Sequence, residues 1–117
     1  MQDIKYYENL AKEIRRETIE MVYKTKTSHI GSSLSMVELL VALYFEILSI
    51  DPKNPIDENR DKFILSKGHG CPSFYPVLAK RGFFDKELLQ KFATDGGAFE
   101  QHPLRDLSKG IEISSGS

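Results

Sequence analysis

The stretch KFILSKGHGC, residues 62–71, decides the fold that this chain is expected to adopt. It begins with a short apolar run and ends with a histidine, His69, between two glycines. The run KFILS, residues 62–66, is too apolar to alternate between a buried and an exposed face, which is typical of a strand covered on both sides of its sheet. One histidine after a strand is weak evidence of function, so the rest of the sequence has to show whether it serves a site.

The N-terminal residues predict a long surface helix over 4–24. Apolar or small side chains recur there with a period of 3.6 residues, and charged residues take the opposite face. The predicted buried stripe consists of Ile4, Tyr7, Ala11, Ile14, Thr18, Met21 and Val22.

Three further helices are expected. Ser35 and Glu38 have the spacing of a capping box, which predicts a helix over 36–48. That helix is apolar nearly all round, so we expect it to be buried in a core or an interface. Another is predicted over 71–81, with Pro72 in its first turn and Gly82 past its end. The last, within 85–93, is capped by Asp85.

The expected elements are four helices and one convincing strand, followed by a long loop over 94–117. A lone buried strand cannot satisfy its own backbone hydrogen-bonding groups. It has to pair with strands that this chain does not contain. We therefore expect an α/β fold in which residues 1–117 form the opening, N-terminal part of a larger domain.

Composition excludes several classes of partner. The 117 residues carry a formal net charge of −1, which argues against a nucleic-acid surface. The longest apolar run, residues 39–45, is far shorter than the roughly 20 residues that span a bilayer, and the N-terminus has no apolar signal region. A single cysteine, Cys71, excludes an internal disulfide and fits a reducing compartment. We expect a cytoplasmic protein without nucleic-acid or membrane partners.

The candidate catalytic residues are the three histidines: His29, His69 and His102. Each stands beside small or turn-forming residues, and any one of them alone is more often a solvated surface residue than a catalyst. A zinc site with Cys71 as a fourth ligand is an alternative. Zinc sites usually contain a close ligand pair such as C-x₂-C or H-x₃-H, and the only close pair here is His69-x-Cys71, which disfavours zinc.

The order of four motifs resembles the N-terminal segment of transketolase. They are SHIGSSLSMVELL, DKFILSKGHG, EQHP and the C-terminal GIEISSGS. The family typically shows G-H-P-G before an apolar helix, L-S-x-G-H-A after the first strand, G-H-P in a later loop and T-G-P-L-G at the next helix. The likeness covers roughly residues 12–117. It departs from the family at Ser28 and Ile30, which replace Gly and Pro, and at Gly70, which replaces Ala.

The resemblance implies the transfer of a two-carbon ketol unit between sugar phosphates with thiamine diphosphate, and a place in the pentose phosphate pathway. By this likeness His29 and His102 would face the substrate, and His69 would lie near the cofactor's diphosphate and the reacting centre. Gly116 and Ser117 would contact the cofactor. Glycines around His69 would then let the backbone turn sharply and the cofactor approach closely.

The likeness also implies what this chain lacks. The family holds Mg²⁺ or Ca²⁺ and the diphosphate through a downstream G-D-G…N segment, so no metal ligand is assigned here. A second subunit or C-terminal half would complete the site, giving a homodimer or a heterotetramer. We therefore expect the 117-residue chain to be inactive alone.

Other functions stay open. Within the thiamine enzymes the alternatives are dihydroxyacetone synthase, 1-deoxyxylulose-5-phosphate synthase and a transketolase-like enzyme of special sugar synthesis. A different class is a non-catalytic interaction fragment, in which the apolar helix over 36–48 binds a partner and the histidines are incidental. The coding sequence after Ser117 distinguishes them, because L-G-x-G followed by G-D-G indicates the enzyme.

Overall fold

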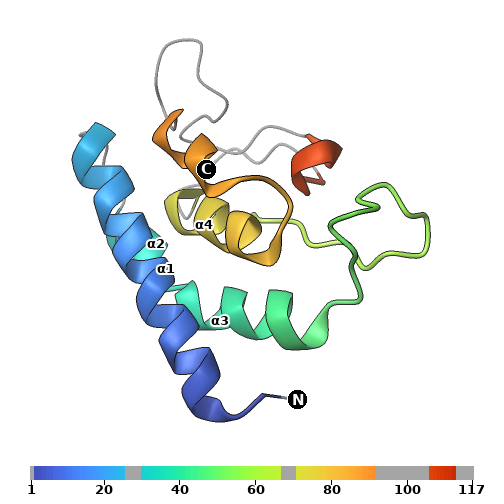
Figure 1. Ribbon diagram of the computed structural model, residues 1–117, viewed down its shortest axis with the longest axis horizontal. Helices are drawn as coiled ribbons and strands as arrows, with labels where there is room; N and C mark the ends of the chain where they lie inside the picture. The colour runs from blue at the N-terminus through green and yellow to red at the C-terminus, as the bar shows by residue number, and fades with distance from the viewer. Residues whose placement is uncertain (1, 26–29, 67–70, 92–105, 113–117) are drawn as a thin grey trace.

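The computed structural model describes residues 2–25, 30–66, 71–91 and 106–112. Its main elements are four α-helices: α1 (Ile4–Thr25), α2 (Ile30–Leu34), α3 (Val37–Ala42) and α4 (Cys71–Arg81). A π-helical turn, η1 (Leu43–Ile47), continues α3, and two 3₁₀ helices, η3 (Lys86–Lys91) and η4 (Leu107–Lys109), follow α4. In Figure 1, α1 runs along one side of the molecule and α4 lies near its centre.

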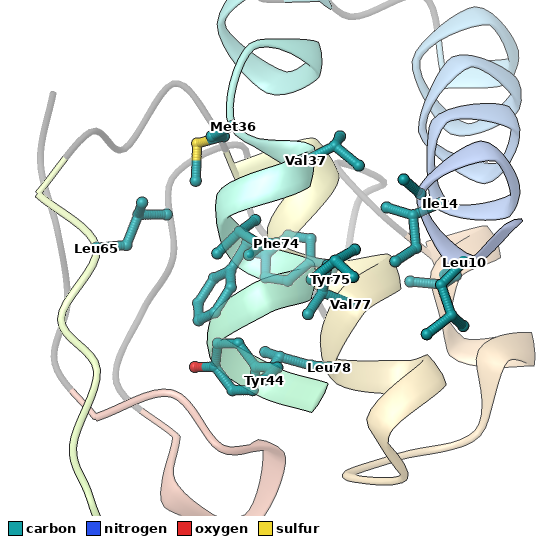
Figure 2. Close-up of a cluster of buried hydrophobic side chains, with 14 of the residues drawn as sticks. Leu10, Ile14, Met36, Val37, Tyr44, Leu65, Phe74, Tyr75, Val77 and Leu78 are labelled. Atoms are coloured by element: carbon teal, nitrogen blue, oxygen red, sulfur yellow. The ribbon is translucent and has the colours of Figure 1, made fainter. Parts of the chain in front are cut away.

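Helix α4 is the centre of the hydrophobic core. It packs against α1, α2, α3, η1 and η3. Figure 2 shows its side chains between those of α1 and those of α3 and η1, with Leu65 on the far side. The largest fully buried side chains include Phe74 and Tyr75 of α4, Ile14 of α1 and Leu40 of α3. The helices bury their amphipathic faces against one another, and the most extensive contact joins α1 and α4, which are far apart in sequence.

The predicted helix over 4–24 is confirmed as α1. Most of its predicted stripe is buried. Thr18 is fully buried, and its hydroxyl is satisfied there by donating a 2.7 Å hydrogen bond to the Ile14 carbonyl. The stripe is wrong at its start, where Ile4 is 73% exposed. An ion pair also joins α1 to α4: Nζ of Lys80 in α4 lies 2.7 Å from Oε2 of Glu13 in α1.

The predicted helix over 36–48 is confirmed as α3 and η1, but its expected N-cap is wrong. The N-cap is Met36 rather than Ser35, and it makes no side-chain capping hydrogen bond. Within this single chain the helix is buried on one side: Val37 and Leu40 are fully buried, whereas Leu39 is 60% and Ile47 65% exposed. Burial in a core is confirmed for the first side, and burial of the second side in an interface stays a prediction. The short helix α2 before it was not expected.

The end of η1 is held by Arg81. Its Nε donates to the Tyr44 carbonyl at 2.9 Å, and its Nη2 donates to the Ile50 carbonyl at 3.1 Å. Helix C-terminal carbonyls have no partner within the helix. A guanidinium from the last turn of α4 supplies one here, and it ties α4 to the loop that follows η1.

The strand expected over 62–66 is absent. Residues 61–66 are neither helix nor strand, and in the described ranges the β-type pairing consists of a single antiparallel bridge, Asp106 to Ile111. A strand needs a hydrogen-bonded neighbour, and none of the described segments provides one for these residues. The described part of the chain is therefore helical, and the α/β sheet remains a prediction.

Helix α4 begins and ends as predicted, with Pro72 in its first turn and Gly82, at φ +109°, directly after it. The region predicted as a helix within 85–93 forms the shorter 3₁₀ helix η3. The long loop predicted over 94–117 is partly wrong, because residues 106–112 form a compact turn around η4.

Gly110 provides a test of that turn. Its φ is +80°, and an added Cβ would lie 2.8 Å from Cδ1 of Phe83. Gly110→Ala should therefore lower the free energy of unfolding by about 1–3 kcal/mol through backbone strain and overpacking. Gly31→Ala is the control, because a Cβ there meets nothing within 4 Å and alanine favours the helix. Denaturant unfolding measures both, and equal stability of the two variants would contradict the described turn.

Candidate active site

The predicted site residues lie outside the described residues. This holds for His29, His69, His102, Gly116 and Ser117. The structure therefore neither brings the three histidines together nor separates them, and their roles stay predictions. What it does describe is the framework from which the segments that carry them depart.

Two of these segments lead into helices that touch each other. His29 immediately precedes α2, and His69 stands two positions before α4. Helix α2 packs against α4, and Ser33 of α2 and Ser73 of α4 are both fully buried. The two helices thus belong to one packed unit.

The segment around His69 is anchored on both sides. Before it, Leu65 is 7% exposed and belongs to the core cluster together with Met36 and Phe74. After it, Pro72 and Ser73 are fully buried at the start of α4. The described residues on either side of positions 67–70 are thus both part of the packed core.

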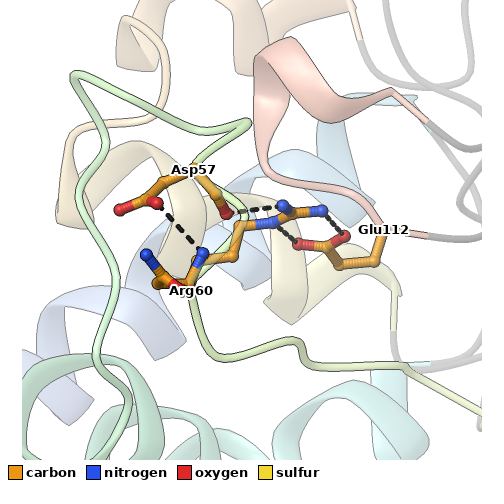
Figure 3. Close-up of polar contacts among 4 residues, drawn as sticks. Asp57, Arg60 and Glu112 are labelled. Carbon is orange, nitrogen blue, oxygen red and sulfur yellow. Dashed lines mark hydrogen bonds and ion pairs between the residues drawn. The ribbon is translucent and has the colours of Figure 1, made fainter.

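The last described residue, Glu112, is held by an ion pair with Arg60 (Figure 3). Nε and Nη2 of Arg60 donate to the two carboxylate oxygens of Glu112 at 2.7 and 2.6 Å, and Nη1 donates to the Asp57 carbonyl at 2.7 Å. The side chains are only 12% and 13% exposed. The hydrogen bonds that Arg60 donates to Glu112 raise the pKa of Arg60. Burial, together with the nearby Glu112 charge, raises the pKa of Tyr44.

The turn that leads to Glu112 is closed by hydrogen bonds. The backbones of Asp106 and Ile111 exchange two bonds of 2.9 Å. The Asp106 carboxylate accepts from the Ser108 amide, the Ser108 hydroxyl and the Lys109 ammonium at 3.1, 2.6 and 2.5 Å. Burial acts to raise the pKa of Asp106, but the hydrogen bonds from Lys109 and Ser108 outweigh it and lower the pKa.

No sequence pattern indicated the Arg60–Glu112 pair. Arg60 lies between the helix predicted over 36–48 and the strand predicted over 62–66, Glu112 lies in the loop predicted over 94–117, and 52 positions separate them. Arginine and glutamate are common in solvated loops, and no local pattern shows which of them meet. The Arg60–Glu112 contact is seen only in the structure, where the turn over 106–112 packs against Phe83.

The cavity between α1 and α3 does not suit a diphosphate. It measures about 430 Å³ and combines apolar side chains with the charged residues Glu8, Lys12, Arg15, Glu38 and Glu46. Three carboxylates and two cations disfavour an anionic ligand. In the described ranges, no group of three His, Cys, Asp or Glu side chains is placed to hold a metal ion, and no helix is long and apolar enough to cross a membrane.

Comparison with known proteins decides the family. Residues 7–117 match the model of the family described as transketolase, thiamine diphosphate binding domain. The chain belongs to the transketolase family. The likeness proposed from the four sequence motifs is confirmed at the level of the family.

Relatives and a solved structure agree with this transketolase assignment. The chain is 42% identical over 104 residues to the 6-deoxy-6-sulfo-D-fructose transketolase subunit SqwG of Clostridium sp. (strain MSTE9), covering 89% of this chain and 38% of that protein. It is 37% identical over 103 residues to one of the apulose-4-phosphate transketolase subunits of Phocaeicola vulgatus, covering 88% of this chain and 36% of that protein. The transketolase from Leishmania mexicana superposes with a TM-score of 0.84 at 28% identity, covering 94% of this chain and 17% of that one. This transketolase chain therefore spans less than two fifths of the length of these relatives.

Proposed function

We propose that this chain contributes to the thiamine diphosphate site of a transferase that moves a two-carbon ketol unit from a ketose phosphate to an aldose phosphate. The match of residues 7–117 to a thiamine diphosphate binding domain carries this proposal. The cofactor, when bound, supplies the nucleophile for the ketose carbonyl and accepts the electron pair that carbon–carbon cleavage releases.

In this proposal the chain's own residues bind, orient and move protons. His29 and His102 hydrogen-bond the hydroxyls and the carbonyl oxygen of the sugar, and they exchange protons with them. Imidazole suits this task because its pKa, near 6.5, lets it donate or accept near neutral pH. His69 lies by the diphosphate and near the reacting centre, where its imidazole also exchanges a proton. Gly116 and Ser117 place backbone against the cofactor, where a glycine leaves space for close approach.

We further propose that the site is completed from outside these residues. Two relatives are named as subunits of transketolases, which supports a second chain that supplies the other half of the site. By the family resemblance, the Mg²⁺ or Ca²⁺ ligands come from the G-D-G…N segment, which residues 1–117 do not contain. The assembly would then be a homodimer or a heterotetramer.

A second candidate is a transketolase that acts on an uncommon sugar. The relatives that support it are named for 6-deoxy-6-sulfo-D-fructose and for apulose 4-phosphate. Their sugars differ from each other although both proteins are similar to this chain to nearly the same degree. The helical framework is thus compatible with several donors, and an assay has to include both common and modified ketoses.

The proposal is tested by ketol transfer with the complete protein, with its partner chain where there is one. Ketose phosphates and modified ketoses serve as donors and an aldose phosphate as acceptor, and the products are followed by mass spectrometry. Transfer that requires added thiamine diphosphate and a divalent metal is the expected result. Absence of transfer with every donor, from a protein that folds and assembles, would contradict the proposal.

The 117-residue chain on its own should show no ketol transfer. Catalysis needs preorganised groups around the reacting atoms, and in this proposal a second chain and the G-D-G…N segment supply part of them. The same assay with the purified short chain checks this. Turnover above the rate without protein would show that these residues form a complete site.

A further inference from the structure

The cavity between α1 and α3 has the size of a small-molecule site. Its volume is about 430 Å³, and small-molecule sites measure roughly 300–1,000 Å³. The cavities beside Glu17 and beside Arg60 are smaller, at about 180 and 10 Å³. In Figure 1, α3 starts beside the middle of α1, and the two helices then diverge. The residues that line the cavity come from these diverging parts, the N-terminal half of α1 and the run from α3 into η1.

Two side-chain bridges hold this cavity open. Arg15 of α1 donates to Glu38 of α3 at one end, and Tyr7 of α1 donates to Glu46 of η1 at the other. Tyr7 and Arg15 stand about 12 Å apart along α1, at a rise of about 1.5 Å per residue. A partner helix is itself about 10–12 Å wide and would have to lie across both bridges. The space between the bridges therefore suits a small molecule better than a helix.

The floor of the cavity is apolar. Ala11 and Val41 are buried, at 5% and 3% exposure, and the small side chain of Ala42 lies on the cavity wall. Ile4, which is 73% exposed, adds apolar surface at the edge. A ligand with an apolar body would remove this surface from water, which is favourable by about 25 cal/mol per Å².

The charged side chains around this floor leave an excess of one negative charge. They comprise three carboxylates and two cations. Each cation has a carboxylate within reach: Arg15 pairs with Glu38, and Lys12 follows Glu8 by one turn of α1. The remaining carboxylate is Glu46.

Glu46 has a neutral partner. It accepts a hydrogen bond from the Tyr7 hydroxyl, and this bond raises the pKa of Tyr7 above its ordinary alkaline value. Tyr7 therefore carries no charge near neutral pH and does not compensate the carboxylate. A cationic group beside Glu46 would be attracted, and an anion would be repelled.

We propose that the cavity between α1 and α3 is a binding site for small organic cations that carry an apolar body, such as arylalkylamines. The apolar body lies against Ala11, Val41 and Ala42, and the ammonium group donates to the Glu46 carboxylate. This site goes beyond the proposed function, in which these residues have no role.

Isothermal titration of tryptamine into the complete protein tests this proposal. We expect saturable binding, and indolepropionate, an anion with the same ring and a similar chain, should bind about tenfold more weakly or worse. Glu46→Gln keeps the shape of the side chain but removes its charge, and it should raise the tryptamine Kd by about 3- to 10-fold. Ala42→Trp places an indole ring in the cavity and should abolish saturable binding.

The matched control is Glu20→Gln, the same change at an exposed carboxylate of α1 that does not line this cavity. It should leave the tryptamine Kd within about twofold. The proposal is overturned if the folded wild type does not bind tryptamine, if the two indole compounds bind equally, or if Ala42→Trp leaves the Kd unchanged. Should Ala42→Trp not fold, an unchanged Kd in Glu46→Gln overturns it instead. The titration needs no thiamine diphosphate, so its outcome is separate from that of the ketol-transfer assay.

Discussion

Replacing His69 by alanine should lower kcat/KM for ketol transfer in the complete enzyme by about 10²- to 10⁴-fold, the range for removal of a proton-transferring group. The residue stands in the motif that matches the family. It also stands in a segment whose two ends, at Leu65 and Pro72, are fixed in the core. A group presented by such a framework loses little entropy in the transition state, so its removal is expected to be costly.

Two further variants separate chemistry from folding. His69→Gln keeps a hydrogen-bond donor of similar reach but cannot exchange a proton, and it should be nearly as impaired as His69→Ala. Lys62→Ala changes an exposed side chain in the same stretch and should keep full activity. Circular dichroism should show all three variants folded. Activity of His69→Ala within about threefold of the wild type would contradict a role for His69 at the reacting centre.

Replacing Phe74 by alanine should destabilise the fold by about 3–5 kcal/mol, the usual cost of emptying an aromatic core position. Phe74 is 2% exposed. Its ring lies 5.5 Å from that of Phe63 and 6.0 Å from that of Tyr44, measured between centroids. The substitution therefore removes contacts between α4, η1 and the segment that leads to His69.

Denaturant unfolding of the 117-residue chain, followed by circular dichroism, measures this loss. Tyr23→Ala is the control, because Tyr23 is 80% exposed and its removal should change stability by no more than about 0.5 kcal/mol. A loss below about 1 kcal/mol for Phe74→Ala would show that α4 is not the centre of the core.

The helices were predictable to the extent that their determinants are local. Periodic burial defined α1, and Pro72 with Gly82 marked the ends of α4, because a proline and a left-handed glycine constrain the backbone where they stand. Ser35 was wrongly predicted as the N-cap of the next helix. Its amide donates to the Gly31 carbonyl at 3.1 Å and so continues the turn after α2, and the helix starts one residue later. The one-sided burial of α3 and η1 could not be predicted from the sequence, since the exposed Leu39 and Ile47 are as apolar as the buried Leu40.

The candidate site was predictable only as a set of residues. The motifs named the histidines and the family, but they gave no distances, because residues far apart in sequence meet only through packing. The Arg60–Glu112 contact is of this kind. The strand over 62–66 was predicted from composition alone, and whether such a run forms a strand depends on a neighbour that composition does not specify.

Titration of thiamine diphosphate into the complete protein with Mg²⁺ tests the central claim most directly, which is that this chain carries part of a transketolase cofactor site. We predict saturable binding, with one cofactor per completed site, that is lost when His69 and Gly116 are replaced together by alanine and valine. Absence of binding by the folded wild-type assembly, or binding that this double replacement leaves unchanged, would contradict the claim.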